Sequence, residues 1–184
     1  FGHMPLILGA DGSKLSKRHG GVSVEEYKRE GFLPQALANY LVLLGWMPRD
    51  GREVMPLDEA VRLFEVSEMN DVQAKFDLQK LRWLNGEYIM RVSNAELLPL
   101  VKAELSAYAL DVSGIADDYL ARVLALYKVR LKTLGDFPLM TDSFFRDYFV
   151  LEEDGLAQLA KPESRECLAV VADRLAAVEP FTHD

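Results

Sequence analysis

The sequence predicts a mainly α-helical protein that begins with a short β-hairpin. From Ser23 onward, apolar residues recur at helical spacing, and the expected helices carry capping residues at their ends. Before Ser23, the apolar run Pro5 to Leu8 is followed by Gly9-Ala10-Asp11-Gly12, and Asp-Gly is a strong signal for a tight turn. The regular alternation of strand and helix that builds a parallel sheet is missing from the sequence.

Helix boundaries in the first half of the chain follow from capping residues. Ser23 and Glu26 form a capping box, in which the hydroxyl and the carboxylate each satisfy a free backbone N–H group. Proline is favourable at the first position of a helix, and aspartate can accept hydrogen bonds from the free N–H groups there. The helices expected from these signals are Ser23 to Gly31, Pro34 to Gly45, Leu57 to Phe64, and Asp77 to a left-handed turn at Asn85-Gly86.

The second half of the chain is helical by the same criteria. Ser93 and Glu96 make another capping box, with Pro99 near the end of the first turns. We expect helices near residues 94–109, 117–134, 141–149 and 162–178. We interpret the acidic run Glu152-Glu153-Asp154 as a solvated turn, and we expect a domain boundary near Met90 to Ser93.

Composition narrows the class of protein. Of the 184 residues, 49% are apolar and 27% are charged, which is typical of a soluble globular protein. No apolar run approaches the roughly 20 residues of a membrane span and no secretory signal is visible, so we expect a cytoplasmic protein without a membrane partner. Cys167 is the single cysteine and the 3 histidines are scattered, which predicts neither disulfides nor a metal site. The net charge of −8 argues against indiscriminate coating of nucleic acid, but not against docking on local basic patches.

Positive charge is concentrated on a glycine-flanked loop near the start of the chain. The stretch "GADGSKLSKRHGG", residues 9–21, carries Lys14, Lys17, Arg18 and His19. Its composition leaves two interpretations open, a solvated surface loop or a mobile loop that binds an anion.

A second concentration of positive charge lies in "YLARVLALYKVRLKTLG", residues 119–135. At helical spacing, a single apolar stripe contains Leu120, Val123, Leu124, Tyr127, Leu131 and Leu134. The basic residues beside or away from this stripe are Arg122, Lys128, Arg130 and Lys132. We interpret the segment as a core helix with a basic outer surface, which is either solvated or faces an anionic partner.

The order of residues in the basic loop favours a binding function. "KLSKR" at Lys14 to Arg18 resembles the signature loop of the aminoacyl-tRNA synthetases whose catalytic domain is a Rossmann fold. The longer stretch "PLILGADGSKLSKRHGGVSVEEYKREGFLPQALANYLVLLGW" resembles bacterial glutamyl-tRNA synthetases, and so does "FDLQKLRWLNGEYI" at Phe76 to Ile89. "RLKTLGDF" at Arg130 to Phe137 is similar to an Arg-x-Lys-Thr-Leu element in the anticodon-binding half of that family. The segment Asn70 to Lys75 departs from the family by being more polar.

This resemblance implies a reaction, its partners and the residues involved. In the family, glutamate and ATP with Mg²⁺ give glutamyl-adenylate and pyrophosphate, and glutamate then passes to the 3′ end of tRNA(Glu). The resemblance assigns Lys17 to the ATP phosphates, assisted by Lys14, with Ser16 as a hydrogen-bonding residue and Arg18 as the last signature residue. It makes four residues candidates for tRNA contacts: Arg122, Lys128, Arg130 and Lys132. We expect the ligase to act as a monomer.

Part of the family's catalytic machinery is missing from the sequence. The other nucleotide signature, His-x-Gly-His, does not occur, and glutamate recognition belongs to the same Rossmann half. We therefore expect a carboxy-side portion of the enzyme that cannot charge tRNA by itself. Its expected parts are the signature loop and stem-contact region (1–92), a first anticodon-binding subdomain in an α-helix cage (93–150), and the start of a second subdomain (151–184).

Two other hypotheses stay open. A truncated relative of these enzymes glutamylates a modified base in tRNA(Asp), but that relative lacks an anticodon-binding region, whereas this chain continues with helices after Ser93. A non-catalytic helical module for tRNA or protein binding would not need an intact signature loop. Trp46 and Trp83 are expected to be packing anchors, and Cys167 is expected to be a small buried side chain.

Overall fold

The structure, a computed structural model, describes residues 5–16, 23–146 and 152–178. Its packing divides the chain into two compact units, Phe1–Phe145 and Arg146–Asp184. The described residues are mainly helical, as predicted, and the β-structure among them consists of isolated bridges. No helix within these ranges is long and apolar enough to cross a membrane.

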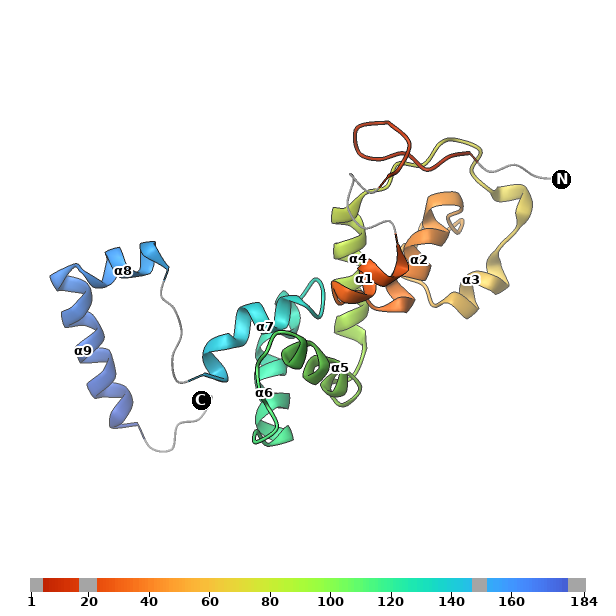
Figure 1. Cartoon of the computed structure of the whole chain (residues 1–184). Helices are drawn as coiled ribbons and strands as arrows, with labels where there is room; N and C mark the ends of the chain where they lie inside the picture. The colour runs from red at the N-terminus through yellow and green to blue at the C-terminus, as the bar shows by residue number, and fades with distance from the viewer. Residues whose placement is uncertain (1–4, 17–22, 147–151, 179–184) are drawn as a thin grey trace. The chain divides into compact units, whose positions relative to one another are not determined.

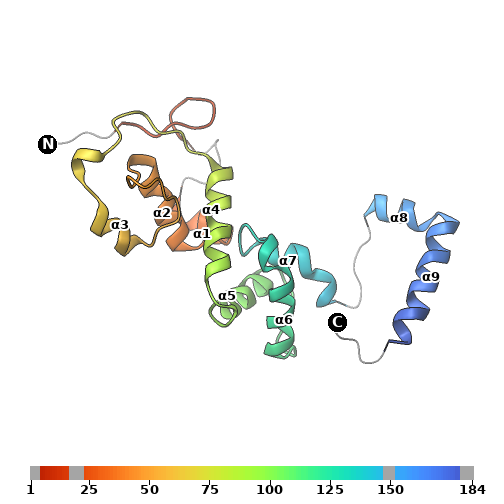
Figure 2. The ribbon, with the colours of Figure 1, turned by 180° about the vertical axis from the view of Figure 1, so that it is seen from behind.

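The first unit is arranged around α4 (Leu78–Arg91). Along its first half lies α2 (Pro34–Gly45), with α1 (Val24–Arg29) nearby, and α3 (Leu57–Leu63) packs on α2 (Figures 1 and 2). Beyond the end of α4, three helices pack together: α5 (Asn94–Ala107), α6 (Asp117–Tyr127) and α7 (Asp136–Thr141). Short 3₁₀ turns are η2 (Val66–Glu68), η3 (Lys128–Arg130) and η4 (Asp142–Phe144).

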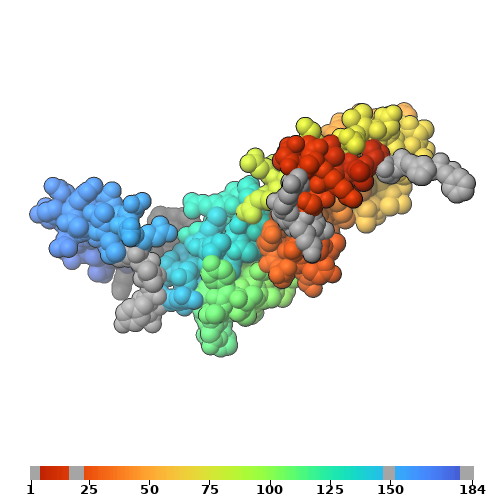
Figure 3. Space-filling model, turned by 45° about the horizontal axis from the view of Figure 1, so that its top comes forward, coloured from red at the N-terminus to blue at the C-terminus, as the bar shows by residue number. Residues whose placement is uncertain are grey.

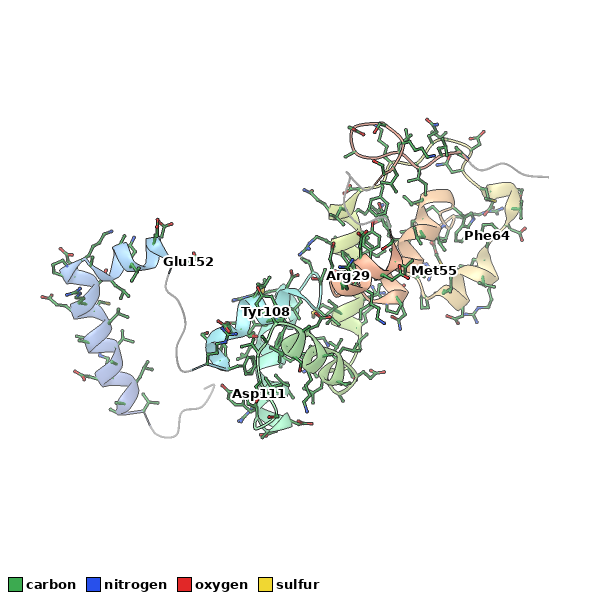
Figure 4. The ribbon with its side chains drawn as sticks, viewed as in Figure 1. Arg29, Met55, Phe64, Tyr108, Asp111 and Glu152 are labelled. Carbon is green, nitrogen blue, oxygen red and sulfur yellow. The ribbon has the colours of Figure 1, made fainter. Side chains whose placement is uncertain are left out.

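Apolar clusters on both halves of α4 hold the first unit together. Near its start, Leu81 and Leu84 are fully buried among aromatic rings, including Tyr40 and Phe76, whose ring centroids lie 5.2 Å apart. Near its end, Ile89 joins a larger cluster with the buried leucines of α5, α6 and the segment after η3. A smaller cluster between α2 and α3 contains Met55, which is labelled in Figure 4. These clusters make α4 the element that connects the two halves of the unit.

The predicted capping residues are confirmed. The Glu26 N–H group donates to the Ser23 hydroxyl (3.2 Å), and the Ser93 hydroxyl and Glu96 form the same arrangement at the start of α5. Asp77 accepts from the first N–H groups of α4, and Pro34 opens α2. The starts of these helices are therefore determined by local side-chain chemistry.

The predicted end of the Asp77 helix at Asn85-Gly86 is wrong. α4 continues through both residues to Arg91, and Asn85 is fully buried. Asparagine and glycine commonly end helices because they adopt left-handed backbone conformations. Here they stay helical because another segment packs against them at this point, as described below.

Two helix predictions in the second half also need correction. The helix expected over 117–134 ends at Tyr127 and is followed by η3, although Leu131 and Leu134 are buried as the apolar stripe predicts. In place of the helix near 141–149, α7 covers Asp136–Thr141 and η4 follows; residues 147–149 lie outside the described ranges.

The second unit consists of α8 (Glu153–Leu159) and α9 (Pro162–Ala176), which pack on each other. The helix predicted near 162–178 is confirmed, whereas the turn predicted at Glu152-Glu153-Asp154 is wrong because the acids begin α8. Carboxylates are favourable there because the first N–H groups of a helix carry partial positive charge. Cys167 is exposed, contrary to the expectation of a buried side chain.

The packing boundary at Phe145 differs in position from the boundary expected near residue 92. The large apolar cluster contains Leu33 and Ile89 from one side of residue 92 and Leu97 from the other side. The division into 1–92, 93–150 and 151–184 therefore stays a prediction about function, and it does not describe packing units.

Candidate functional site

The predicted tight turn lies within residues 5–16, which we call the signature segment. The Gly12 N–H group donates to the Gly9 carbonyl (3.0 Å), and the Gly9 N–H group donates to the Ser13 carbonyl (2.7 Å). Gly12 has a φ of +77°, a conformation that glycine adopts without steric cost. The Asp11 carboxylate accepts from the Ser13 N–H group (2.9 Å) and hydroxyl (2.7 Å). The turn is thus closed by backbone and side-chain hydrogen bonds, and Lys14 follows it directly in the sequence.

The chain before the turn pairs both with the chain after the turn and with the segment that precedes α4. Leu8 is bridged antiparallel to Lys14 and parallel to Lys75. The Leu8 N–H group donates to the Ala74 carbonyl (2.9 Å), and the Phe76 N–H group donates to the Leu8 carbonyl (2.8 Å). Figure 3 shows the red surface of residues 5–16 against the yellow-green surface of the segment before α4. The Asn70 to Lys75 segment, which departs from the family pattern, thus contributes one of these backbone hydrogen bonds, through the Ala74 carbonyl.

A cluster of buried aromatic side chains packs against the signature segment. Ile7 and Leu15 pack against the cluster that contains Tyr27, Tyr40 and Phe76. The Tyr40 hydroxyl accepts a hydrogen bond from the Asp77 N–H group (2.6 Å), which joins α2 to the start of α4. Burial raises the pKa of Tyr27 to about 12 and also raises the pKa of Tyr40, because a buried phenolate loses its hydration. The signature segment therefore packs against buried aromatic side chains, whose phenol groups keep their protons at neutral pH.

The structure places two of the predicted phosphate-binding residues. Lys14 follows the turn and is exposed, and Ser16 is half-buried two residues further along. Lys17 and Arg18 lie outside the described residues. Lys14 thus leads out of a fixed turn toward the residues that the resemblance assigns to ATP.

The basic residues predicted to bind tRNA occupy different local environments. Arg122 pairs with Asp118 (3.5 Å) at the exposed surface of α6, and the Arg130 guanidinium lies 5.6 Å from the centroid of the Tyr127 ring. The Lys128 ammonium donates to the Val92 carbonyl at the end of α4 (2.5 Å). Their predicted placement on one helix is therefore wrong, because α6 ends before Lys128.

The segment Leu131 to Asp136 is locked onto the middle of α4. The Asn85 amide donates to the Lys132 carbonyl (2.6 Å), while the Asn85 carbonyl oxygen accepts from the Leu33 N–H group (2.8 Å). The Asp136 carboxylate accepts from the Lys132 and Thr133 N–H groups and pairs with Arg82 of α4 (2.9 Å). This contact explains why Asn85 and Gly86 lie within a helix: they form the surface on which the segment docks.

The turn after α1 packs against the same segment. Gly31 has a φ of +79°, and its carbonyl accepts from the Leu134 N–H group (2.9 Å). A Cβ atom on Gly31 would overlap the Gly135 nitrogen, so no other residue fits without displacement. The turn after α1, the middle of α4 and the segment after η3 therefore meet at one place. We call this contact the joint; it is formed by Gly31, Leu33, Arg82, Asn85 and residues 131–136.

Sequence reasoning missed the joint and misplaced one tryptophan. No local pattern links Arg82 to Asp136 or Asn85 to Lys132, because these pairs are 54 and 47 residues apart. Trp46 is buried (3% exposed), which confirms its role as a packing anchor. Trp83 on α4 is 39% exposed, so the same expectation is wrong for Trp83.

Comparisons with known proteins cover both halves of the chain. The family model described as "tRNA synthetases class I (E and Q), catalytic domain" matches residues 1–83, and the model described as "Anticodon binding domain" matches residues 95–184. "Glutamate--tRNA ligase 2" of Caldicellulosiruptor saccharolyticus is 35% identical over 182 residues, and the glutamate–tRNA ligase of Nitrosospira multiformis is 40% identical over 179 residues. The chain belongs to the glutamate–tRNA ligase family.

The similarity to glutamate–tRNA ligases extends to structure. The crystal structure of the Elizabethkingia meningosepticum glutamate tRNA ligase, in complex with its amino acid, is similar with a TM-score of 0.79 and 25% identity over 96% of this chain. This chain spans 38% of the length of that protein. It also spans 38% of the length of each of the two ligases compared by sequence. Those two sequence matches cover 99% and 97% of this chain. The fold and the family therefore agree along nearly the whole chain.

Proposed function

We propose that this chain is part of a glutamate–tRNA ligase, which activates glutamate with ATP and transfers it to the 3′ end of tRNA(Glu). The observation that carries the proposal is the anchored signature segment, which lies in a chain whose halves match a catalytic and an anticodon-binding family model in succession. The hypothesis of a non-catalytic interaction module is not favoured, since the curated relatives are glutamate–tRNA ligases.

In this proposal the signature loop supplies positive charge to the triphosphate. Lys17 binds the ATP phosphates, Lys14 assists from the end of the fixed turn, and Ser16 hydrogen-bonds within the loop or to a phosphate. The exposed ammonium of Lys14 suits a polyphosphate, which carries several acceptor oxygens. When pyrophosphate leaves, preorganised cations stabilise the charge that develops on it. Mg²⁺ accompanies ATP as its counter-ion, and Arg18 completes the loop.

The helical part of the chain binds tRNA in this proposal. Arg122, Lys128, Arg130 and Lys132 are the candidate contacts, and residues 95–184 match the anticodon-binding model. ATP and glutamate would be held by the Rossmann half of a monomeric, cytoplasmic ligase. Since proximity contributes nothing when a reactant is not held, the 184-residue chain alone should not charge tRNA.

Pyrophosphate exchange in a complete ligase that contains this segment tests the proposal. Lys17→Ala should lower the rate of adenylate formation by about 10² to 10³, the order seen when one preorganised electrostatic contact is removed. Tight tRNA binding should survive, because the tRNA contacts lie on other elements. Arg62→Ala on α3 is the control for loss of an exposed cation and should exchange normally. A normal exchange rate in Lys17→Ala would remove Lys17 from the mechanism.

A further inference from the structure

The residue immediately before Lys14 is held by a single carboxylate. Oδ1 of Asp11 accepts hydrogen bonds from both the Ser13 N–H group (2.9 Å) and the Ser13 hydroxyl (2.7 Å). The Ser13 carbonyl accepts from the Gly9 N–H group (2.7 Å), so each polar group of Ser13 has a partner within the turn. Aspartate side chains that bond the backbone two residues further on stabilise turns. Asp11 therefore fixes the conformation of the chain at the point where it reaches Lys14.

The direction of the Lys14 side chain follows from the pairing beside the turn. Lys14 is bridged to Leu8, and the next N–H group, that of Leu15, donates to the Ile7 carbonyl (3.1 Å). Ile7 and Leu15 both pack against the buried aromatic cluster. Because neighbouring residues of a paired strand point to opposite faces, Lys14 points away from this cluster, and its side chain is exposed.

The turn also determines the register of this pairing. A slip of one residue moves every side chain of a strand to the other face, which would turn Lys14 toward the aromatic cluster and Leu15 toward solvent. Long strands resist such slips through many ladder contacts, but the pairing among the described residues consists of isolated bridges. The turn, and the carboxylate that closes it, must therefore specify the register.

We propose that Asp11 is a positioning residue for adenylate formation: by holding Ser13, it keeps the Lys14 ammonium directed at the triphosphate of ATP. The inference rests on the proposed function, in which Lys14 assists at the ATP phosphates. Asp11 acts through Lys14 and has no contact with ATP in this proposal. Its carboxylate would repel a phosphate, and here Oδ1 is engaged by Ser13 instead.

Pyrophosphate exchange in a complete ligase that contains this segment tests the proposal. Asp11→Ala removes both hydrogen bonds and should lower kcat/KM for ATP by about tenfold, because a smaller fraction of the enzyme then holds Lys14 in place. The KM for glutamate should not change. Asp11→Asn keeps a side-chain oxygen at the same position and should recover most of the lost rate.

A second turn of the same kind provides the matched control. Oδ1 of Asp50 accepts from the Arg52 N–H group (3.1 Å) across Gly51, whose φ of +73° is close to the +77° of Gly12. This turn lies between α2 and α3 and takes no part in the pairing of the signature segment. Asp50→Ala should therefore exchange pyrophosphate at the parent's rate.

A double-mutant cycle separates positioning from a general structural role. Lys14→Ala removes the group that Asp11 is proposed to position, so Asp11→Ala/Lys14→Ala should be no slower than Lys14→Ala alone. If Asp11 only maintained the fold, its loss would slow the Lys14→Ala enzyme by the same factor as it slows the parent enzyme. Losses that multiply in this way would overturn the inference.

The remaining outcomes distinguish this inference from the proposed function. A normal rate in Asp11→Ala, or an equal loss in Asp11→Asn, overturns the inference; if Lys17→Ala is slow in the same assay, the proposed function stands. If Lys14→Ala and Lys17→Ala both exchange normally, the inference and the proposed role of the signature loop fail together.

Discussion

Asn85 shows at the residue scale how a single buried side chain fixes the joint. Its amide bonds the Leu33 N–H group and the Lys132 carbonyl, which belong to segments far from α4 in sequence. Asn85→Ala leaves the buried Leu33 N–H group and the part-buried Lys132 carbonyl without this partner, and each such loss costs about 1–3 kcal/mol.

We expect Asn85→Ala to lower the free energy of unfolding of the first unit by about 2–5 kcal/mol. Urea titration followed by tryptophan emission measures this unit, because both tryptophans lie in it. Gln79→Ala, an exposed position on the same helix, should change stability by less than about 0.5 kcal/mol. Equal effects of the two substitutions would refute the role of Asn85.

Tyr27 gives the unit a pH dependence at the alkaline end. Its pKa is raised from 10.0 to about 12, mainly by burial, so the unfolded chain loses this proton first. The contribution of Tyr27 to stability should be complete below about pH 10 and should fall as the pH rises toward 12. Tyr27→Phe should make the decline of the urea midpoint over this range shallower; an unchanged decline would show that Tyr27 does not titrate differently on folding.

At the scale of the element, local chemistry predicted where helices begin better than where they end. The capping boxes at Ser23 and Ser93 depend on residues within one turn, so the sequence contains the whole interaction. Asn85-Gly86 suggested a helix end because its partners are about 50 residues away in sequence and leave no local trace. Leu131 and Leu134 continued the apolar stripe of α6 because burial selects apolar residues in any backbone conformation.

The turn between α1 and α2 can be tested with two glycines of similar conformation. Gly31 and Gly51 have φ values of +79° and +73°, but of the two only Gly31 is packed against another segment, where an added Cβ atom would overlap the Gly135 nitrogen. Gly51→Ala should cost about 1 kcal/mol, the strain of a left-handed alanine. Gly31→Ala should cost clearly more in urea titration, because the docked segment must also move. Similar costs would mean that the close approach is not required.

The capping box of α5 should respond to acid. Hydrogen bonds from the Ser93 hydroxyl (2.6 Å) and N–H group (3.1 Å) lower the pKa of Glu96. Because the folded-state pKa is lowered, the contribution to stability is present above the ordinary pKa of glutamate and is lost as the pH falls through the lowered value. Glu96→Gln should therefore reduce stability at neutral pH and flatten its acid dependence in urea titrations between about pH 7 and 3. A variant with the parent's full acid dependence would contradict this.

On the scale of the whole molecule, sequence predicted the family and the basic segments but not how they are connected. The signature loop and the "RLKTLGDF" segment were each recognised separately. In the structure both segments are held at or next to α4. The signature loop is held by the pairing of Leu8 with Lys75, just before α4, and the "RLKTLGDF" segment is held by Asn85 in the middle of α4. These long-range pairs depend on packing geometry, which single-sequence patterns do not contain.

We propose that this chain is a tRNA-binding part of a glutamate–tRNA ligase. Labelled tRNA(Glu), titrated with the purified chain across a salt series, tests it most directly. We predict weak binding whose log affinity falls with log salt by roughly 0.7–0.9 per phosphate contact, and a slope flattened by about one to two in Arg130→Ala/Lys132→Ala. Binding that does not depend on salt, or a double variant with the parent's slope, would contradict the claim.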